Sequence, residues 1–181
     1  MFDLPGHILI LTGSPGAGKT TTARSLVAAS AAPAVHLHSD DFWHFIQKGA
    51  IPPYLPESRK QNKVVIGILA KASEGYAKGG YFVVVDGIVG PWFIRPFMRL
   101  KQPIHYIVLR PDLDAAIERC RLRGGDALAD PEVIDSLHKQ FSVLGEFGNH
   151  IIETVGHSPE ETLAAVHAGL VSGHFRLVRS A

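Results

Sequence analysis

The eight residues from Gly13 to Thr20 constrain the fold of this chain more than any other stretch. They read GSPGAGKT and match the pattern G-x-x-x-x-G-K-[ST], the P-loop or Walker A motif, without a mismatch. An apolar run at 7–12 precedes the motif, and residues 21–29 follow it with apolar side chains at helical spacing. The sequence therefore predicts a strand, a phosphate-binding loop and a helix in succession.

The residue types of this loop indicate a nucleotide and a divalent cation. Glycines adopt positive φ and carry no Cβ, so successive backbone N–H groups can converge on phosphate oxygens at the positive end of the helix. Lys19 would reach the β- and γ-phosphates, and the Thr20 hydroxyl would ligate Mg²⁺. We expect ATP and Mg²⁺ as cofactors. The expected nucleotide-binding residues of the loop are Gly13, Ser14, Pro15, Gly16, Ala17, Gly18, Lys19 and Thr20.

Composition narrows the class of protein further. A chain of 181 residues suits a single domain, 1–181. The formal net charge of +1, without a run of like charges, argues against a nucleic-acid arm or a polybasic membrane patch. A lone cysteine, Cys120, excludes an internal disulfide, and no signal-type leader or membrane-length apolar run is present. We expect a cytoplasmic protein.

Apolar runs alternate with helical patterns along the whole chain. This alternation predicts an α/β fold with a parallel sheet and helices on both faces. The run at 81–86 has no polar residue before its last position, which predicts a central strand covered on both faces. The predicted strands lie within residues 7–12, 34–38, 81–86, 103–110 and 150–154.

Several connecting segments have readable patterns. A proline-rich stretch, 49–56, predicts a surface loop, and Cys120 belongs to the buried stripe of a short helix. Asp130 and Ser158 are predicted helix N-caps, whereas residues 174–181 form a tail without periodic signal. A helix is predicted over about 57–77. Its expected buried face comprises Val65, Ile68, Leu69, Ala72 and Tyr76.

Carboxylates follow two of the predicted strands. Asp86 ends the third strand, where an acid in P-loop enzymes holds Mg²⁺; a turn or capping role is the alternative. Asp40 and Asp41 end the second strand, at the carboxyl edge where open α/β sheets bind ligands. We expect Asp40 to be the catalytic base and to help orient the metal, and Asp41 to begin the next helix.

Three arginines precede a pair of glycines. Arg119 and Arg123 are four residues apart, so they share a helix face and can point at one anion, and Arg121 would add to nucleotide binding. Glycines at 124–125 supply a hinge, which predicts a lid over about 119–130 that closes on the triphosphate. The alternative is an exposed basic helix end.

Histidines invite a metal-binding hypothesis. His36, His38 and Asp40 alternate along the second strand and would lie on one face of it. No further ligand with H-E-x-x-H or C-x-x-C spacing accompanies them, so the sequence disfavours zinc.

The motifs GSPGAGKT, HSDD, VVVDG and R-x-R-x-R together resemble the compact P-loop kinases, namely the chloramphenicol phosphotransferase-like, shikimate kinase-like, gluconate kinase-like and zeta-toxin-like proteins. The resemblance implies the strand order 2-3-1-4-5. It also implies that Asp40 faces the acceptor hydroxyl, although gluconate-kinase-like spacing selects Asp41. Adenine would lie between the lid and the loop after strand five, which contains Thr154 and Gly156. The acceptor would lie between the proline-rich loop, the helix after it and residues 90–95.

These features lead to one main hypothesis and two alternatives. The main hypothesis is an ATP- and Mg²⁺-dependent kinase that transfers the γ-phosphate to a hydroxyl of a small molecule. One alternative is an ATP-binding regulatory switch with slow hydrolysis, and the other is a polynucleotide 5'-hydroxyl kinase, which the near-neutral charge disfavours. The absence of an N-K-x-D motif disfavours a GTPase, and the chain length disfavours an AAA+ motor with its own lid domain.

Overall fold

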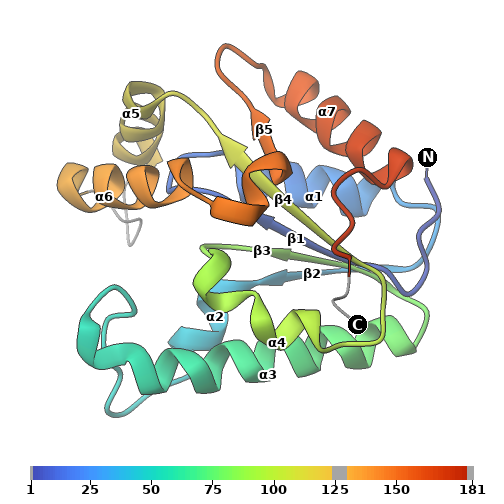
Figure 1. The fold of residues 1–181 in the computed structure, drawn as a ribbon, viewed down its shortest axis with the longest axis horizontal. Coiled ribbons are helices and arrows are strands. Elements are labelled where there is room, and N and C mark those ends of the chain that lie inside the picture. The colour runs from blue at the N-terminus through green and yellow to red at the C-terminus, as the bar shows by residue number, and fades with distance from the viewer. Residues whose placement is uncertain (1, 124–129, 179–181) are drawn as a thin grey trace.

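Five strands form one parallel sheet in the order β2-β3-β1-β4-β5, which confirms the predicted fold class. The computed structural model describes residues 2–123 and 130–178 (Figure 1). Each strand lies within the apolar run that predicted it. The strands are β1 (Ile8–Thr12), β2 (Ala34–His38), β3 (Phe82–Asp86), β4 (Ile104–Arg110) and β5 (Ile151–Glu153).

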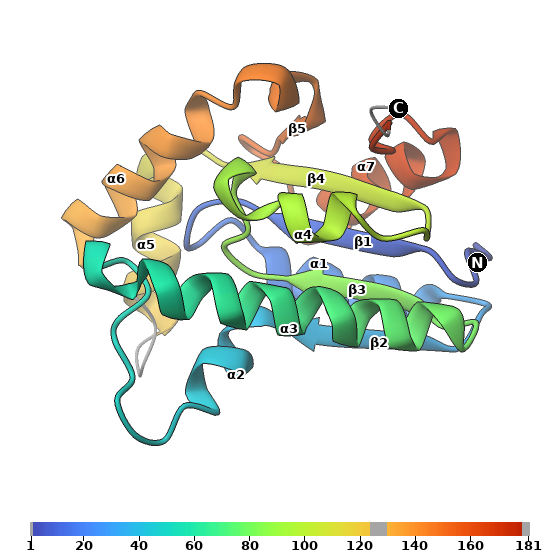
Figure 2. The same cartoon turned by 60° about the horizontal axis from the view of Figure 1, so that its bottom comes forward.

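Helices cover both faces of this sheet. Figure 1 shows α1 and α7 on one face and α3 and α4 on the other, and Figure 2 shows α3 running along the sheet. Within the described residues the α-helices are α1 (Lys19–Ala29), α2 (Ser39–His44), α3 (Arg59–Lys78), α4 (Arg95–Met98), α5 (Leu113–Arg123), α6 (Pro131–Ser142) and α7 (Pro159–Ser172). The short 3-10 helices are η1 (Pro56–Ser58), η2 (Pro91–Phe93) and η3 (Gly145–His150).

The central strands are buried on both faces, as the continuous apolar runs predicted. All five residues of β3 are buried, and so are all five of β1 beside it. Side chains of alternate parity pack into two separate cores, one under α3 and α4 and the other under α1 and α7. The register pairs Asp86 with Leu11 on one side and with His38 on the other. The carboxyl ends of β1, β2 and β3 therefore meet at one edge of the sheet.

The buried face of α3 differs from the predicted one. Ile68 and Tyr76 are 52% and 44% exposed, so their predicted burial is wrong. Polar residues take part in the buried face instead, and the Ser73 hydroxyl donates a hydrogen bond to the backbone carbonyl of Leu69. A prediction from apolar positions alone therefore places the buried face of α3 at a different angle around the helix than the structure does. The buried residues of α3 are Asn62, Val65, Ile66, Leu69, Ala70, Ser73 and Ala77.

Two polar side chains of α3 fasten the proline-rich loop. Gln61 Nε2 donates to the Ile51 carbonyl at 2.6 Å, and the Ile51 N–H donates back to Gln61 Oε1 at 2.9 Å. Asn62 Nδ2 donates to the Pro53 carbonyl at 2.8 Å, while its Oδ1 accepts from Trp43 Nε1 of α2 at 2.8 Å. The loop and α2 are thus held to the first turns of α3 by partly buried amide hydrogen bonds.

The predicted capping residues and the buried cysteine are confirmed. The Asp130 carboxylate accepts from the Glu132 N–H at the start of α6. Ser158 and Glu161 form a reciprocal capping box at the start of α7. Cys120 is 1% exposed. None of the described helices is long and apolar enough to cross a membrane.

Part of the tail is ordered against the sheet, which its sequence did not predict. The Tyr106 N–H donates to the Phe175 carbonyl at 2.9 Å, and the Leu177 N–H donates to the Ile104 carbonyl at 2.8 Å. Phe175 is buried and occupies the space over Gly169 of α7, where a Cβ would come 2.3 Å from its ring. Residues 174–178 thus run beside the beginning of β4, and residues 179–181 lie outside the described part of the chain.

Two stacked histidines lie at the amino-terminal edge of the sheet. His7 Nδ1 and His105 Nε2 are 3.0 Å apart, and the two rings stack with their centroids 5.3 Å apart. His105 is 2% exposed. Its burial, together with the nearby His7 and the Arg176 guanidinium, lowers the pKa of His105 to about 4. The folded protein therefore holds this imidazole neutral at pH values where an unfolded chain would protonate it.

Lowering the pH should therefore reduce the free energy of unfolding, already at pH values above 4. Between pH 6.5 and about 4 the unfolded chain binds a proton at His105 that the folded protein does not bind, so stability falls as pH falls. The loss assigned to this residue is roughly 3 kcal/mol. Between pH 4 and 8, the free energy of unfolding measured in urea should change less steeply with pH for His105→Phe than for the parent. His44→Gln, at an exposed position, is the control, and equal slopes for His105→Phe and the parent would contradict the assignment.

Candidate functional site

The loop between β1 and α1 has the backbone geometry of a phosphate cradle. Gly13, Gly16 and Gly18 all have positive φ, and Gly18 precedes the first residue of α1. The loop is pressed against its neighbours, since a Cβ on Gly16 would come 2.2 Å from the Ala116 carbonyl oxygen of α5. A Cβ on Gly13 would similarly come 2.3 Å from the carbonyl oxygen of Leu109 in β4. Gly13 and Gly16 are therefore required by packing as well as by φ, whereas Gly18 is required by φ alone.

Lys19 bridges the loop from the first turn of α1. Its Nζ donates to the carbonyls of Gly13 at 3.0 Å and Ser14 at 2.8 Å. Burial lowers the pKa of Lys19 to about 8, and the carboxylates of Asp86 and Asp40 oppose that effect. Ser14 Oγ is buried and has no hydrogen-bond partner among the described residues. An ammonium on carbonyls and an orphaned hydroxyl fit a site whose anionic ligand supplies the remaining partners.

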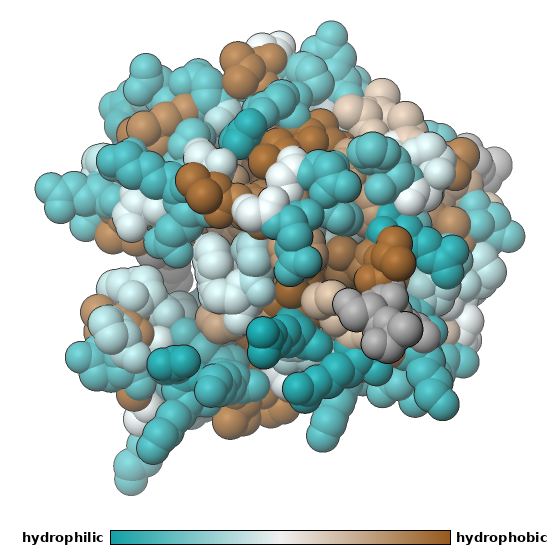
Figure 3. Space-filling model, in the orientation of Figure 1, coloured by the Kyte–Doolittle hydropathy of each residue, from teal (hydrophilic) through white to brown (hydrophobic). Residues whose placement is uncertain are grey.

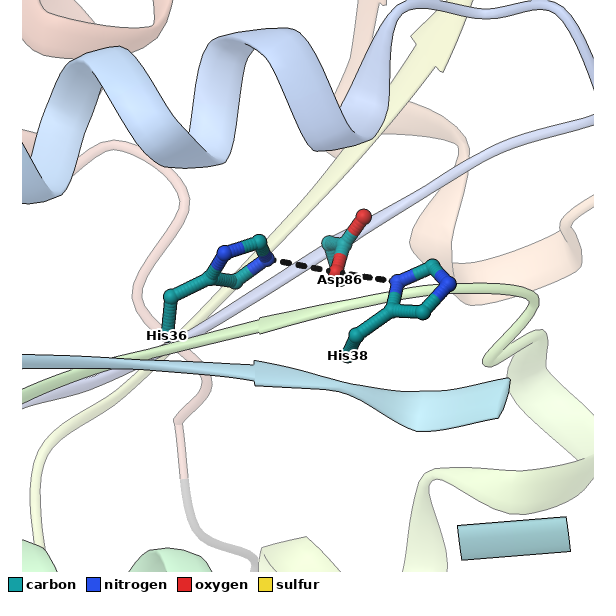
Figure 4. A group of neighbouring side chains, drawn as sticks. All are labelled: His36, His38 and Asp86. Atoms are coloured by element: carbon teal, nitrogen blue, oxygen red, sulfur yellow. Dashed lines mark hydrogen bonds and ion pairs between the residues drawn. The ribbon is translucent and has the colours of Figure 1, made fainter. Parts of the chain in front are cut away.

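Asp86 lies at the end of β3 and is fully buried. The Thr20 hydroxyl of α1 donates to its Oδ2 at 2.5 Å. Two imidazoles of β2 face its other oxygen, with His36 Nε2 2.7 Å and His38 Nδ1 2.8 Å from Oδ1 (Figure 4). Thr20 and Asp86, both predicted metal ligands, are thus in direct contact. The turn or capping alternative for Asp86 has no support in these contacts.

Electrostatics keeps this buried carboxylate ionised. Burial alone would raise the pKa of Asp86, but hydrogen bonds from His36, His38 and Thr20 outweigh burial and hold the pKa well below its usual range. The hydrogen bond to Asp86 in turn raises the pKa of His38, aided by the charges of Asp40 and Asp41. A fixed negative charge therefore lies one hydrogen bond from Thr20, which suits divalent-cation binding.

Asp40 lies in the first turn of α2 beside these residues. Its carboxylate is 54% exposed, and its Oδ2 is 3.7 Å from His38 Nε2. Helix α2 begins at Ser39 with His38 as its N-cap, so the prediction that Asp41 starts the helix is wrong. The helix can begin this early because Gly87 makes room: a Cβ there would lie 1.7 Å from Ser39 Oγ. Asp40 is left accessible to a ligand at the carboxyl edge of the sheet.

The three arginines of α5 have different surroundings. Arg119 Nη1 donates to the Gly16 carbonyl of the P-loop at 3.3 Å. The charge of Arg123 contributes to the lowered pKa of Lys19, so this guanidinium also acts on the loop. Arg121 instead forms an ion pair with Glu118 of the same helix at 2.8 Å. The predicted glycine hinge at 124–125 lies outside the described residues.

The loop after β5 has a buried polar group of its own. Thr154 is 3% exposed, and its Oγ1 has no hydrogen-bond partner among the described residues. Its backbone N–H donates to the Arg110 carbonyl at 2.9 Å, and Gly156 turns the chain with a φ of 74°. The sequence did not predict a role for Arg110, whose guanidinium pairs with the Glu153 carboxylate across β4 and β5. Neither residue belongs to a motif, so no local signal identifies the pair.

Aromatic and apolar side chains lie on the surface of the elements that were predicted to bind the acceptor. Trp92 of η2 is 45% exposed, and its ring lies 5.6 Å from that of Phe141 in α6. An apolar groove of about 360 Å³ between α2 and α3 includes Phe42, Phe45 and Ile68. The surface is also hollowed where α6 lies over the beginning of α3 (Figure 3). The predicted acceptor elements therefore border concave surface.

Comparisons with known proteins agree with this arrangement. The model of the AAA domain family matches residues 8–144. A sugar kinase from Janibacter sp. is similar in structure, with a TM-score of 0.68 at 17% identity over 91% of this chain and 94% of that one. A shikimate kinase from Acinetobacter baumannii has a TM-score of 0.61 at 21% identity over 94% of each chain. A chain of an RNA repair complex has a TM-score of 0.61 at 20% identity over 81% of this chain and 47% of that one.

These likenesses show the fold of a P-loop kinase, as the sequence motifs indicated. No curated protein matches the sequence. The two similar kinases are covered almost in full, so the shared fold extends over the whole length of both.

ATP with Mg²⁺ should stabilise the protein through Lys19. A ligand at one hundred times its dissociation constant adds about 2.7 kcal/mol, which raises the Tm of a domain this size by roughly 5 to 10 °C. Lys19→Ala should lose most of that shift in a thermal melt, because the Lys19 ammonium is the cation that contacts the loop. Lys78→Ala, an exposed lysine at the end of α3, should retain it. A full shift in Lys19→Ala would contradict the P-loop assignment.

Proposed function

Because the chain belongs to the AAA domain family, whose model matches it over residues 8–144, and has a P-loop kinase fold, we propose that it transfers the γ-phosphate of ATP to a hydroxyl of a small molecule. The carrying observation is the convergence of Lys19, Thr20, Asp86 and Asp40 at one sheet edge. The charges of Asp86 and Asp40 both act on Lys19, and Thr20 is bonded to Asp86. A cation, a metal-ligating pair and an accessible carboxylate are the parts that phosphoryl transfer requires.

The nucleotide end of this site would work by charge and position. Lys19 would leave the carbonyls of Gly13 and Ser14 and bond the phosphates, while the loop N–H groups hold the same oxygens. Thr20 and Asp86 would hold Mg²⁺, with Asp40 beside them, and the bound ion supplies positive charge to the phosphate oxygens. Thr154 and Gly156 would line the adenine, where the Thr154 hydroxyl, which has no hydrogen-bond partner in the described part of the chain, suits a ring nitrogen.

Asp40 would act as general base on the acceptor. Its carboxylate accepts the hydroxyl proton while the acceptor oxygen bonds the γ-phosphorus and the bond to ADP breaks. Exposure of Asp40 supports this role, because the acceptor must reach it from solvent. The groove of Phe42 and Phe45 begins two residues further along α2, which favours an acceptor with an apolar part beside its hydroxyl.

The substitution Asp40→Asn tests whether Asp40, and not a neighbouring aspartate, is the general base. The change preserves size and removes the proton-accepting charge, so turnover should fall by on the order of 10² or more while ATP affinity changes little. Asp41→Asn, one residue further along the same exposed turn, is the matched control. A parental rate in Asp40→Asn with loss in Asp41→Asn would move the base to Asp41, as gluconate-kinase-like spacing implies. Asp86→Asn should instead raise the Mg²⁺ concentration needed for activity.

Arg119 should matter more than Arg121 for turnover. Arg119 already contacts the P-loop backbone, whereas Arg121 is engaged by Glu118. Losing a guanidinium that stabilises the leaving phosphoryl group costs on the order of 10² to 10³ in rate, so Arg119→Ala should show a loss of this size. Arg121→Ala in the same steady-state assay is the control. Equal rates for both variants and the parent would make α5 a plain surface helix.

Acceptor-dependent ADP release tests the function itself. Purified protein with Mg²⁺ and ATP is screened against sugars, nucleosides, antibiotics and other hydroxylated metabolites, with apolar acceptors included because of the groove. Release stimulated by a small acceptor and lost in Asp40→Asn supports the kinase. Release that no acceptor stimulates supports the regulatory switch with slow hydrolysis. The likeness to a chain of an RNA repair complex favours including a 5'-hydroxyl oligonucleotide, whose stimulation would support the polynucleotide kinase.

A further inference from the structure

The two oxygens of the Asp86 carboxylate face different chemistry. Oδ2 accepts from Thr20 on the side of the P-loop. Oδ1 faces His36 Nε2 at 2.7 Å and His38 Nδ1 at 2.8 Å, and Figure 4 shows both imidazoles directed at this one oxygen while the other points away from them. His36 and His38 alternate along β2, so both rings lie on the same face of the sheet. We call the side of Asp86 that faces the Thr20 hydroxyl its oxygen side, and the side that faces the two imidazoles its nitrogen side.

The nitrogen side has the dimensions of a metal site. One ring nitrogen of His36, one ring nitrogen of His38 and a carboxylate oxygen of Asp86 all lie within 4.8 Å of one another. Ligands about 2.0 to 2.2 Å from a tetrahedral ion lie about 3.3 Å apart, so the observed N···O separations need to open by only about half an ångström. The side chains of His36 and His38 are 19% and 36% exposed, which leaves a path for an ion and a water ligand.

We propose that His36, His38 and Asp86 Oδ1 bind a divalent transition ion of the Zn²⁺ class, at a position separate from that of the nucleotide Mg²⁺. Imidazole nitrogens favour Zn²⁺ and its neighbours, whereas Mg²⁺ prefers oxygen ligands. Asp40 supports the site as well, because its carboxylate lies 3.7 Å from His38 Nε2, and metal-bound histidines commonly direct their second N–H at a carboxylate. Without an ion, the same two nitrogens donate to Oδ1 instead.

This site is formed by sheet register, which explains why the spacing of the sequence disfavours it. His36 and His38 are two residues apart, but their third ligand follows His38 by 48 residues. It arrives opposite them because β2 and β3 are adjacent and His38 pairs directly with Asp86. The proposal does not depend on phosphate transfer, since it concerns binding of an ion in the absence of nucleotide.

Titration of the full chain with Co²⁺ tests the site. Metal-stripped protein without nucleotide should bind one Co²⁺ with visible absorption bands typical of nitrogen ligation, and a large excess of Mg²⁺ should leave those bands in place. His36→Gln and His38→Gln should each weaken binding by at least about 100-fold, because even partners outside the ligand set cost 10- to 100-fold. His44→Gln, an exposed histidine just beyond these residues on α2, should bind Co²⁺ like the parent.

Three outcomes would overturn the proposal. The parent binds no stoichiometric Co²⁺, the double variant His36→Gln/His38→Gln binds it unchanged, or Thr20→Val loses it as fully as the histidine variants do, which would assign the ion to the oxygen side. Circular dichroism and melting curves establish that each variant is folded. Should a variant unfold, the ring-proton NMR signals of the parent decide: Co²⁺ must shift two histidines. A negative result in these metal-binding experiments would not change acceptor-dependent ADP release, so the metal site and the kinase function are tested separately.

Discussion

The buried negative charge of Asp86 is the constraint on which the candidate site depends. An ionised carboxylate without exposure is costly unless hydrogen-bond donors replace its water. Those donors come from α1 and β2, through Thr20, His36 and His38. The first turn of the P-loop helix and the edge strand are therefore tied to the end of β3 by one group. Any movement that separates these elements must also strip that charge of its partners.

The architecture could be predicted because its determinants are local. Each strand is rich in apolar residues, and the GSPGAGKT motif predicts the first strand, loop and helix without reference to the rest of the chain. The prediction failed at positions where a polar side chain is buried or an apolar side chain is exposed. Asn62 and Ser73 are buried on α3 because their side chains find hydrogen-bond partners, whereas Ile68 is left exposed. A count of apolar positions has no access to such partners.

The sequence predicted where the motif residues of the candidate site lie, but not the contacts between them. Motif position identified Lys19, Thr20 and Asp86, and the edge of a parallel sheet brought them together as expected. The approach of the two imidazoles to Asp86 depends on the register of β2 on β3, which sequence spacing does not encode. Arg110 with Glu153 is similar, as the pair exists only because β4 and β5 are neighbours.

The residues at both ends of the described chain are fastened away from the site. Phe2 pairs with Ser30 after α1, while Phe175 and Leu177 run along the beginning of β4 at the amino-terminal edge of the sheet. The opposite edge carries the glycine loop, the first turn of α2 and the exposed Asp40. The two ends of the described chain therefore cover the amino-terminal edge of the sheet, and neither of them covers the candidate site. A tag or a fused domain attached at either of these ends would start on the side of the sheet opposite Asp40.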